Sequence, residues 1–128
     1  MKKILVLNPA PDLLTVIRDT CSPGYSVDSA RSEAECLGLM AASNYDFLLL
    51  GIDILASRRA PSAKNPWKEA LKPFWQANAH TEIIVTTPQD RIRDAVSAVK
   101  AGAGNYLALP VNPDELKYVL DSILDSKL

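Results

Sequence analysis

One stretch indicates the fold of this chain, residues 82–110, with the sequence EIIVTTPQDRIRDAVSAVKAGAGNYLALP. Its beginning, residues 82–87, is a β-branched run that predicts a strand. Residues 91–101 predict a helix, which Gly102 ends. The apolar residues of this helix recur at helical spacing, at Ile92, Ala95, Val96 and Val99. A second strand is expected over 105–109. The stretch is therefore a strand–helix–strand unit, the building block of parallel sheets.

The same alternation extends over the rest of the chain. Further strands are expected over 3–7, 25–30 and 46–51, and further helices over 12–21, 32–42, 67–77 and from 112 onward. Residues 46–51 are the most hydrophobic stretch, typical of a central parallel strand that is covered on both faces. Five successive strand-then-helix units predict one domain over residues 1–128, with a parallel sheet between two layers of helices.

The segment between the third strand and the next helix is less regular. Residues 54–66 have turn composition and several cations, so we expect an exposed loop. Pro73 lies inside the following helix and should kink or restart it. Trp67 and Trp75 are eight residues apart on that helix, and we expect them to anchor it to the core rather than to form an interaction surface.

The composition argues against several classes of protein. The chain has 14 basic and 15 acidic residues and a formal net charge of -1, whereas a nucleic-acid binder would carry a basic excess. No apolar run reaches the ~20 residues that span a bilayer, and a cytoplasmic location is expected. Cys21, Cys36 and His80 lack the spacing of a metal site, so the cysteines are expected to be buried free thiols.

Four segments resemble the receiver domains of response regulators in two-component signalling. They are Ile4–Leu7 with Pro11–Leu14, Tyr45–Leu50, Ile83–Thr87 and Ala101–Pro110. The likeness covers nearly the whole chain and is weakest over 54–80. Residues 91–116 are most similar to receivers attached to transcription activators of the nitrogen-regulatory, σ54-dependent type. The resemblance implies an α/β flavodoxin-like three-layer sandwich, with a five-stranded parallel sheet in the order 2-1-3-4-5 and about five helices.

A working receiver transfers a phosphoryl group to an aspartate at the end of the third strand. Its acidic residues hold Mg²⁺, and a lysine neutralises the phosphoryl oxygens. The resemblance assigns the acidic pair to Asn8 and Pro9, the acceptor to Gly51, the hydroxyl to Thr87, the aromatic switch to Tyr106, the lysine to Leu109, and the proline of a cis peptide to Pro110.

The charged roles of that site are thus empty in this sequence. Gly51 has no nucleophile, and Leu109 cannot neutralise a phosphate. We expect an atypical receiver that binds no Mg²⁺, has no cofactor and is not phosphorylated in the standard way. It would regulate through contacts with a protein partner or output domain, with no direct contact to nucleic acid or membrane. An enzyme is not expected, because no glycine-rich phosphate loop and no nucleophile with a histidine base are present.

Two alternatives remain open from the sequence. Asp53 follows Gly51 by two residues and is either a displaced phosphoryl acceptor or an ordinary loop aspartate. For Asp12, at the start of a predicted helix, we expect a favourable interaction of its carboxylate with the helix dipole rather than metal binding. The second alternative is a small-molecule sensor, because Gly51 and Leu109 leave an apolar hollow unless Leu109 fills it.

A surface for self-association is a further hypothesis, made on analogy with other receivers. It would use the fourth helix, the fifth strand and the fifth helix of the fold. Its candidate residues are Arg91, Arg93, Lys100, Tyr106, Lys117, Tyr118 and Asp121. Mixed charges and tyrosines suit a modest homodimer interface, and they equally suit plain solvent exposure.

Overall fold

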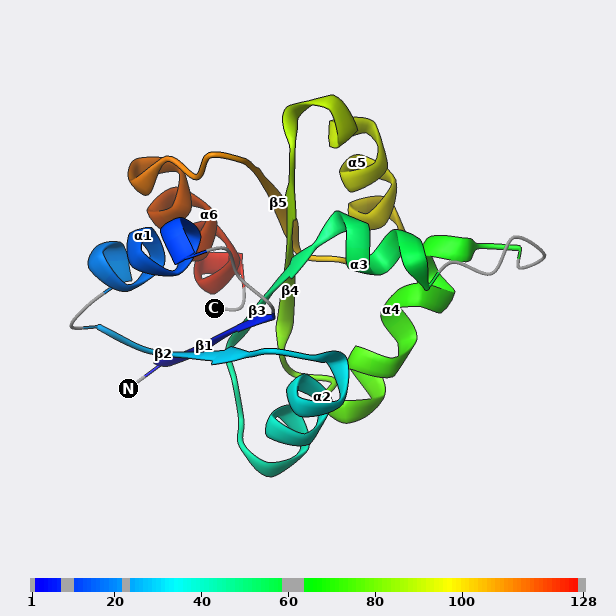
Figure 1. Ribbon diagram of the computed structural model, residues 1–128, viewed down its shortest axis with the longest axis horizontal. Coiled ribbons are helices and arrows are strands. Elements are labelled where there is room, and N and C mark those ends of the chain that lie inside the picture. The colour runs from blue at the N-terminus through cyan, green and yellow to red at the C-terminus, as the bar shows by residue number, and fades with distance from the viewer. Residues whose placement is uncertain (1, 8–10, 22–23, 59–63, 127–128) are drawn as a thin grey trace.

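The sheet has five strands, all parallel, in the order β2-β1-β3-β4-β5 (Figure 1). The computed structural model describes residues 2–7, 11–21, 24–58 and 64–126. The strands are β1 (Lys2–Leu7), β2 (Tyr25–Ala30), β3 (Phe47–Gly51), β4 (Glu82–Thr87) and β5 (Asn105–Ala108). The predicted flavodoxin-like class and strand order are confirmed.

Helices cover both faces of this sheet (Figure 1). They are α1 (Pro11–Cys21), α2 (Glu33–Ala42), α3 (Ile52–Ser57), α4 (Pro66–Ala77), α5 (Ile92–Ala101) and α6 (Pro113–Ser126), with a short 3-10 turn η1 (Gln89–Arg91). Helices α1 and α6 pack together on one face, and α2 to α5 cover the other.

Each face of the sheet carries its own apolar core, because alternate strand residues point to opposite sides. The core beneath α2 to α5 contains the strand residues Leu5, Leu48, Leu50, Ile83 and Val85. The core beneath α1 and α6 contains Ile4, Val6, Phe47, Leu49 and Ile84. The central strands are therefore apolar without interruption, as the hydrophobic run at 46–51 indicated.

Polar side chains cap the starts of three helices. Ser32 Oγ accepts a hydrogen bond from the Glu35 backbone N–H at 3.2 Å at the start of α2. Asn65 Oδ1 accepts one from the Lys68 N–H at 3.2 Å at the start of α4. Asn112 Oδ1 does the same for the first turn of α6. These contacts satisfy backbone donors that have no partner inside the helix.

Residues 54–66 differ from their predicted loop. Helix α3 occupies Ile52–Ser57 and brings the number of α-helices among the described residues to six, and residues 59–63 of the predicted loop lie outside the described residues. The physical reason is burial: Ile52 and Leu55 are fully buried in the core beneath α2 to α5. This packing outweighs the turn composition of the segment, since helices in proteins are stabilised mainly by tertiary contacts.

The helix around Pro73 also differs in part from its prediction. Helix α4 runs through Pro73 without restarting. Leu71 and Phe74 are fully buried and anchor the helix, whereas Trp67 and Trp75 are only partly buried against the same core. Burial on both sides of the proline holds the helix together despite the hydrogen bond that proline cannot donate.

The two cysteines are buried free thiols, as predicted, and His80 is exposed. Burial raises the pKa of Cys36 to about 12, which makes this thiol unreactive at neutral pH. Among the described residues, no helix is long and apolar enough to cross a membrane.

Candidate functional site

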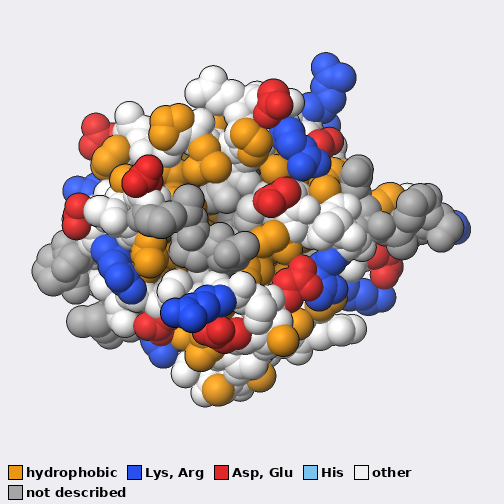
Figure 2. Space-filling view, in the orientation of Figure 1, with side chains coloured by type: hydrophobic (Ala, Val, Ile, Leu, Met, Phe, Trp, Pro, Cys, Tyr) orange, Lys and Arg blue, Asp and Glu red, His pale blue; other side chains and the backbone are white. Residues whose placement is uncertain are grey.

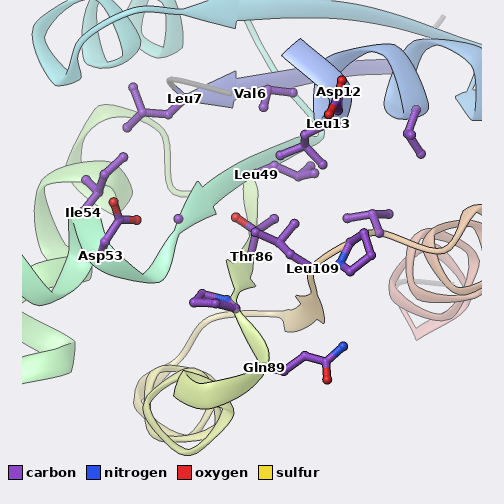
Figure 3. Close-up of a pocket in the computed structure, with 15 residues that line it drawn as sticks. Val6, Leu7, Asp12, Leu13, Leu49, Asp53, Ile54, Thr86, Gln89 and Leu109 are labelled. Atoms are coloured by element: carbon purple, nitrogen blue, oxygen red, sulfur yellow. The ribbon is translucent and has the colours of Figure 1, made fainter. Parts of the chain in front are cut away.

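A cavity of about 480 Å³ lies at the carboxyl ends of the central strands, where open α/β sheets bind ligands (Figure 3). Most of its lining is apolar, from Val6, Leu7, Leu13, Val16, Leu49, Ile54, Pro88, Leu109, Pro110 and Val111. The remaining described lining residues are Asp12, Gly51, Asp53, Thr86 and Gln89. Figure 2 shows apolar side chains near the centre of the molecule in this view, with charges of both signs around them.

Gly51 stands at the centre of this edge, as the last residue of β3 and the residue before α3. It pairs with Thr86 in the register of β3 and β4. A Cβ atom at position 51 would lie 2.6 Å from Oδ1 of Asp53 and 3.9 Å from Oγ1 of Thr86. The space that a side chain at position 51 would enter is therefore occupied by the Asp53 carboxylate.

Asp53 reaches this place because β3 passes directly into α3. The side chain lies in the first turn of α3 and is exposed, and it forms no ion pair with any residue that the structure describes. The short helix turns the chain back, so a residue two positions after Gly51 directs its carboxylate to the end of β3 (Figure 3). The loop predicted from the sequence for this segment did not indicate that the Asp53 carboxylate would lie at the end of β3.

Two adjacent threonines end β4, and they point to opposite faces of the sheet. Thr87, to which the sequence assigned the family's hydroxyl, is fully buried and donates its hydroxyl to the Pro88 carbonyl at 2.9 Å. Thr86 is the residue that lines the cavity beside Gly51. Strand alternation could have indicated that Thr86, and not Thr87, faces the cavity. Residues two apart on a strand share a face, so Gly51 lies on the same face as Leu49 and Thr86 on the same face as Ile84, the face that α1 and α6 cover.

Leu109 and Pro110 close the cavity after β5. Leu109 is half-buried against the core beneath α1 and α6, and its backbone N–H donates to the Thr87 carbonyl at 2.8 Å. The peptide bond between Leu109 and Pro110 is cis, as the resemblance implied. Asn8 and Pro9, the other two positions of the family's site, lie outside the described residues.

The charged side chains in the described lining of the cavity are all acidic. Asp12 and Asp53 contribute carboxylates, and its described lining contains no lysine or arginine. Asp12 lies in the first turn of α1, on the opposite side of the cavity from Asp53 (Figure 3). No group of three or more histidine, cysteine or acidic side chains that could hold a metal occurs among the described residues.

Comparison with known proteins identifies the family, although no family model matches the chain. The chain is 30% identical over 102 residues to the alginate biosynthesis transcriptional regulatory protein AlgB of Pseudomonas syringae pv. tomato, which covers 73% of this chain and 19% of AlgB. It is 32% identical over 93 residues to the transcriptional regulatory protein DltR of Streptococcus agalactiae, 73% of this chain and 38% of DltR. The chain thus matches only about a fifth to two fifths of these relatives.

Solved structures of response regulators are also similar to this chain. A response regulator receiver domain protein from Clostridium thermocellum superimposes with a TM-score of 0.73 at 23% identity, over 99% of this chain and 97% of that one. A response regulator from Burkholderia pseudomallei, solved with a phosphorylated aspartic acid, a calcium ion and citrate, gives 0.67 at 26% identity, over 99% and 71%. The chain belongs to the receiver-domain family of response regulators.

The residues of the candidate self-association surface differ in their exposure and contacts. Tyr106 is a half-buried residue of β5 beside Val85, and Arg91 forms an ion pair with Asp94 at 3.2 Å. Arg93 and Lys100 on α5 are exposed, and Tyr118 on α6 is 71% exposed.

The other two candidate residues of α6 lie on its flank toward α1 and β2. Lys117 interacts electrostatically with Cys21, and Asp121 with Tyr25. Both side chains are exposed, like those of Arg93 and Lys100 on α5.

Proposed function

We propose that this receiver transmits signals through contacts with a protein partner or output domain, without standard aspartyl phosphorylation. The observation that carries the proposal is Gly51 at the end of β3, next to Thr86 and facing the cavity. The family's nucleophile belongs at this position, and glycine has no side chain to attack phosphorus.

The surroundings of Gly51 support the same proposal. Leu109 stands where the family has a lysine, and it adds apolar surface to the cavity instead of a positive charge. Phosphoryl transfer depends on electrostatic neutralisation of the phosphoryl oxygens, which Leu109 cannot provide. Mg²⁺ favours several oxygen ligands, and we propose that the domain does not depend on this ion.

The relatives suggest the setting of this function. AlgB and DltR are transcriptional regulatory proteins. We propose that the chain likewise serves a regulator of transcription, with no catalytic activity of its own. The partner, or an output domain in the same protein, would recognise the receiver surface in its one unphosphorylated form.

A specific observation favours a second candidate, in which Asp53 is a displaced acceptor. Its Oδ1 lies 2.6 Å from where a Cβ atom at Gly51 would be, in the space of the family's acceptor side chain. A carboxylate oxygen of Asp53 would attack the phosphorus of acetyl phosphate, form an acyl phosphate and release acetate. Leu109 weighs against this candidate, because no cation faces the transferred group among the described lining residues.

The experiment that separates the two candidates is incubation with acetyl phosphate and Mg²⁺, followed by intact-mass measurement. We expect no added phosphoryl group on the wild-type chain and none on Asp53→Asn. A phosphoryl group that is present on the wild type and absent from Asp53→Asn would overturn the main proposal in favour of the displaced acceptor.

An amide NMR titration with Mg²⁺ and then beryllofluoride, which mimics an aspartyl phosphate, provides the second readout. The main proposal predicts no saturable shifts at Gly51, Thr86 or Tyr106. Saturable shifts centred on Asp53 and Thr86 would contradict it.

A further inference from the structure

The cavity combines an apolar middle with acidic sides. Leu13, Leu49 and Leu109 extend toward its centre from α1, from β3 and from the segment after β5 (Figure 3). Asp53 lies at one side and Asp12 at the other. A cavity of about 480 Å³ is within the size range of sites for small organic molecules. Its lining would therefore accommodate an apolar body together with a positive charge.

Thr86 adds to this lining a hydroxyl that has no hydrogen-bond partner among the described residues. Its side chain is only 6% exposed, and it forms no hydrogen bond with any residue that the structure describes. The other buried threonines, Thr81 and Thr87, both donate their hydroxyls to backbone carbonyls, at 2.7 and 2.9 Å. Polar groups in protein interiors normally have a partner, and the Thr86 hydroxyl borders the cavity, where a bound molecule can supply one.

The carboxylate of Asp53 and the hydroxyl of Thr86 both lie near Gly51. Oδ1 of Asp53 and Oγ1 of Thr86 lie 2.6 and 3.9 Å from the position of a Cβ atom at Gly51. An ammonium group in the cavity beside these two side chains would donate hydrogen bonds to both oxygens, because both can accept. Its organic substituent would extend over Leu49 and Leu109.

We propose that the cavity binds a small primary amine, protonated and attached to an apolar body, and that this ligand supplies the input that phosphorylation supplies in other receivers. The inference rests on the proposed function in one respect, that the space before Gly51 is not used for phosphoryl transfer. A ligand of this class matches each part of the lining: the carboxylates, the hydroxyl and the apolar middle.

Other classes of ligand fit the same lining less well. An anion would face Asp12 and Asp53 without any lysine or arginine in the described lining. A neutral apolar molecule would leave the Thr86 hydroxyl without a partner, at the cost of an unpaired buried polar group. A hydrogen bond to a charged group favours the amine over the matching alcohol, and we expect about a tenfold difference in Kd.

The test uses three probes that differ only in the head group: 4-phenylbutylamine, 4-phenylbutanol and 4-phenylbutanoate. Each is titrated into the ¹⁵N-labelled full chain at neutral pH, and amide shifts are followed. We expect saturable shifts at Gly51, Asp53, Thr86 and Leu109 with the amine, about tenfold weaker binding of the alcohol, and the weakest binding of the carboxylate. Equal affinity for amine and alcohol, or no saturable binding of the amine, would overturn the proposal.

Variants then assign the effect to the site. Asp53→Asn and Thr86→Val should each reduce the preference for amine over alcohol several-fold, and Leu109→Lys should abolish amine binding by bringing a positive charge into the cavity. Glu69→Gln is the matched control, because this exposed carboxylate lies on α4, beside Lys72 and outside the cavity lining. An unchanged preference in Asp53→Asn and Thr86→Val, with native amide spectra, would contradict the site.

Failure of the amine-binding proposal can be distinguished from failure of the proposed function by combining the amine titration with the phosphorylation experiment. Phosphorylation of Asp53 together with amine binding would refute the proposed function and the role of the amine as the input in place of phosphorylation, and would retain only the binding site. Absence of both would retain the proposed function and refute the ligand site.

Discussion

A buried threonine lies near each end of β4, and the two differ in whether the hydroxyl has a hydrogen-bond partner among the described residues. Thr81, just before the strand, is 3% exposed and donates its hydroxyl to the Tyr45 carbonyl at 2.7 Å. Thr86, near the other end, is 6% exposed, and its hydroxyl has no partner among the described residues. The same side chain, at similar burial, is thus part of the scaffold at one end and available to a ligand at the other.

The contrast extends to the residues around each threonine. At the amino end, Asp46 accepts a hydrogen bond from the Lys3 N–H at 2.8 Å, and the Tyr45 hydroxyl donates to Asp28 at 2.8 Å. At the carboxyl end a cavity replaces such a network. The amino edge of the sheet therefore maintains the fold, and the carboxyl edge retains the space for function, as expected for an open parallel sheet.

The largest expected effect is at the amino edge, at Gly102. Its φ is +132°, and a Cβ atom there would lie 2.7 Å from the ring of Trp75. Gly102→Ala should lower the free energy of unfolding by about 2–5 kcal/mol, from backbone strain and overpacking together. Urea unfolding of the variant measures this, with Gly38→Ala as control, because no atom lies within 4 Å of that Cβ position. Equal stability of the two variants would refute the prediction.

Thr81→Val comes next. The substitution removes the hydrogen bond to Tyr45 and leaves that buried carbonyl without this donor, so we expect a loss of about 1–3 kcal/mol in unfolding free energy. The measurement is the shift of the urea midpoint at constant slope. A loss below the experimental error would mean that the carbonyl finds another donor.

The same network predicts a pH dependence. Burial, and secondly the hydrogen bond to Asp28, raise the pKa of Tyr45 to about 12 from its ordinary value of 10.0. The unfolded chain thus loses this proton first, and the stability that Tyr45 contributes is complete below pH 10 and is lost as the pH rises toward 12. We expect a decline of about 1 kcal/mol per pH unit from this group. Tyr45→Phe should flatten the profile in that window, and an identical slope in both proteins would contradict the assignment.

The smallest effect is expected at Thr86. Thr86→Val keeps the shape of the side chain and breaks no hydrogen bond within the described chain, so the unfolding free energy should change by less than about 0.5 kcal/mol. Urea unfolding beside Thr81→Val gives the matched comparison. A loss as large as that of Thr81→Val would show that the Thr86 hydroxyl has a structural partner.

Much of the fold could be predicted because its signals are local. The helices expected over 32–42 and 67–77 are present as α2 and α4, capped by Ser32 and Asn65, and the apolar run over 46–51 contains the central strand β3. Helix α3 could not be predicted, because its formation depends on the burial of Ile52 and Leu55 by segments distant in the chain.

The candidate site was predicted in its position and only partly in its members. Gly51 and Leu109 were assigned from the resemblance, and both line the cavity. Thr86 was missed in favour of its neighbour Thr87, because an offset of one residue along a strand moves a side chain to the other face of the sheet.

By itself the sequence determined the parallel sheet and the absence of an acidic side chain at position 51, because these follow from local periodicity and residue type, whereas the order of the strands was implied by the resemblance to receiver domains. Only the tertiary structure decided that the carboxylate of Asp53 fills the space before Gly51 and that Thr86 rather than Thr87 faces the cavity. Both depend on strand register and on the turn into α3, and these are settled by packing between residues far apart in the chain.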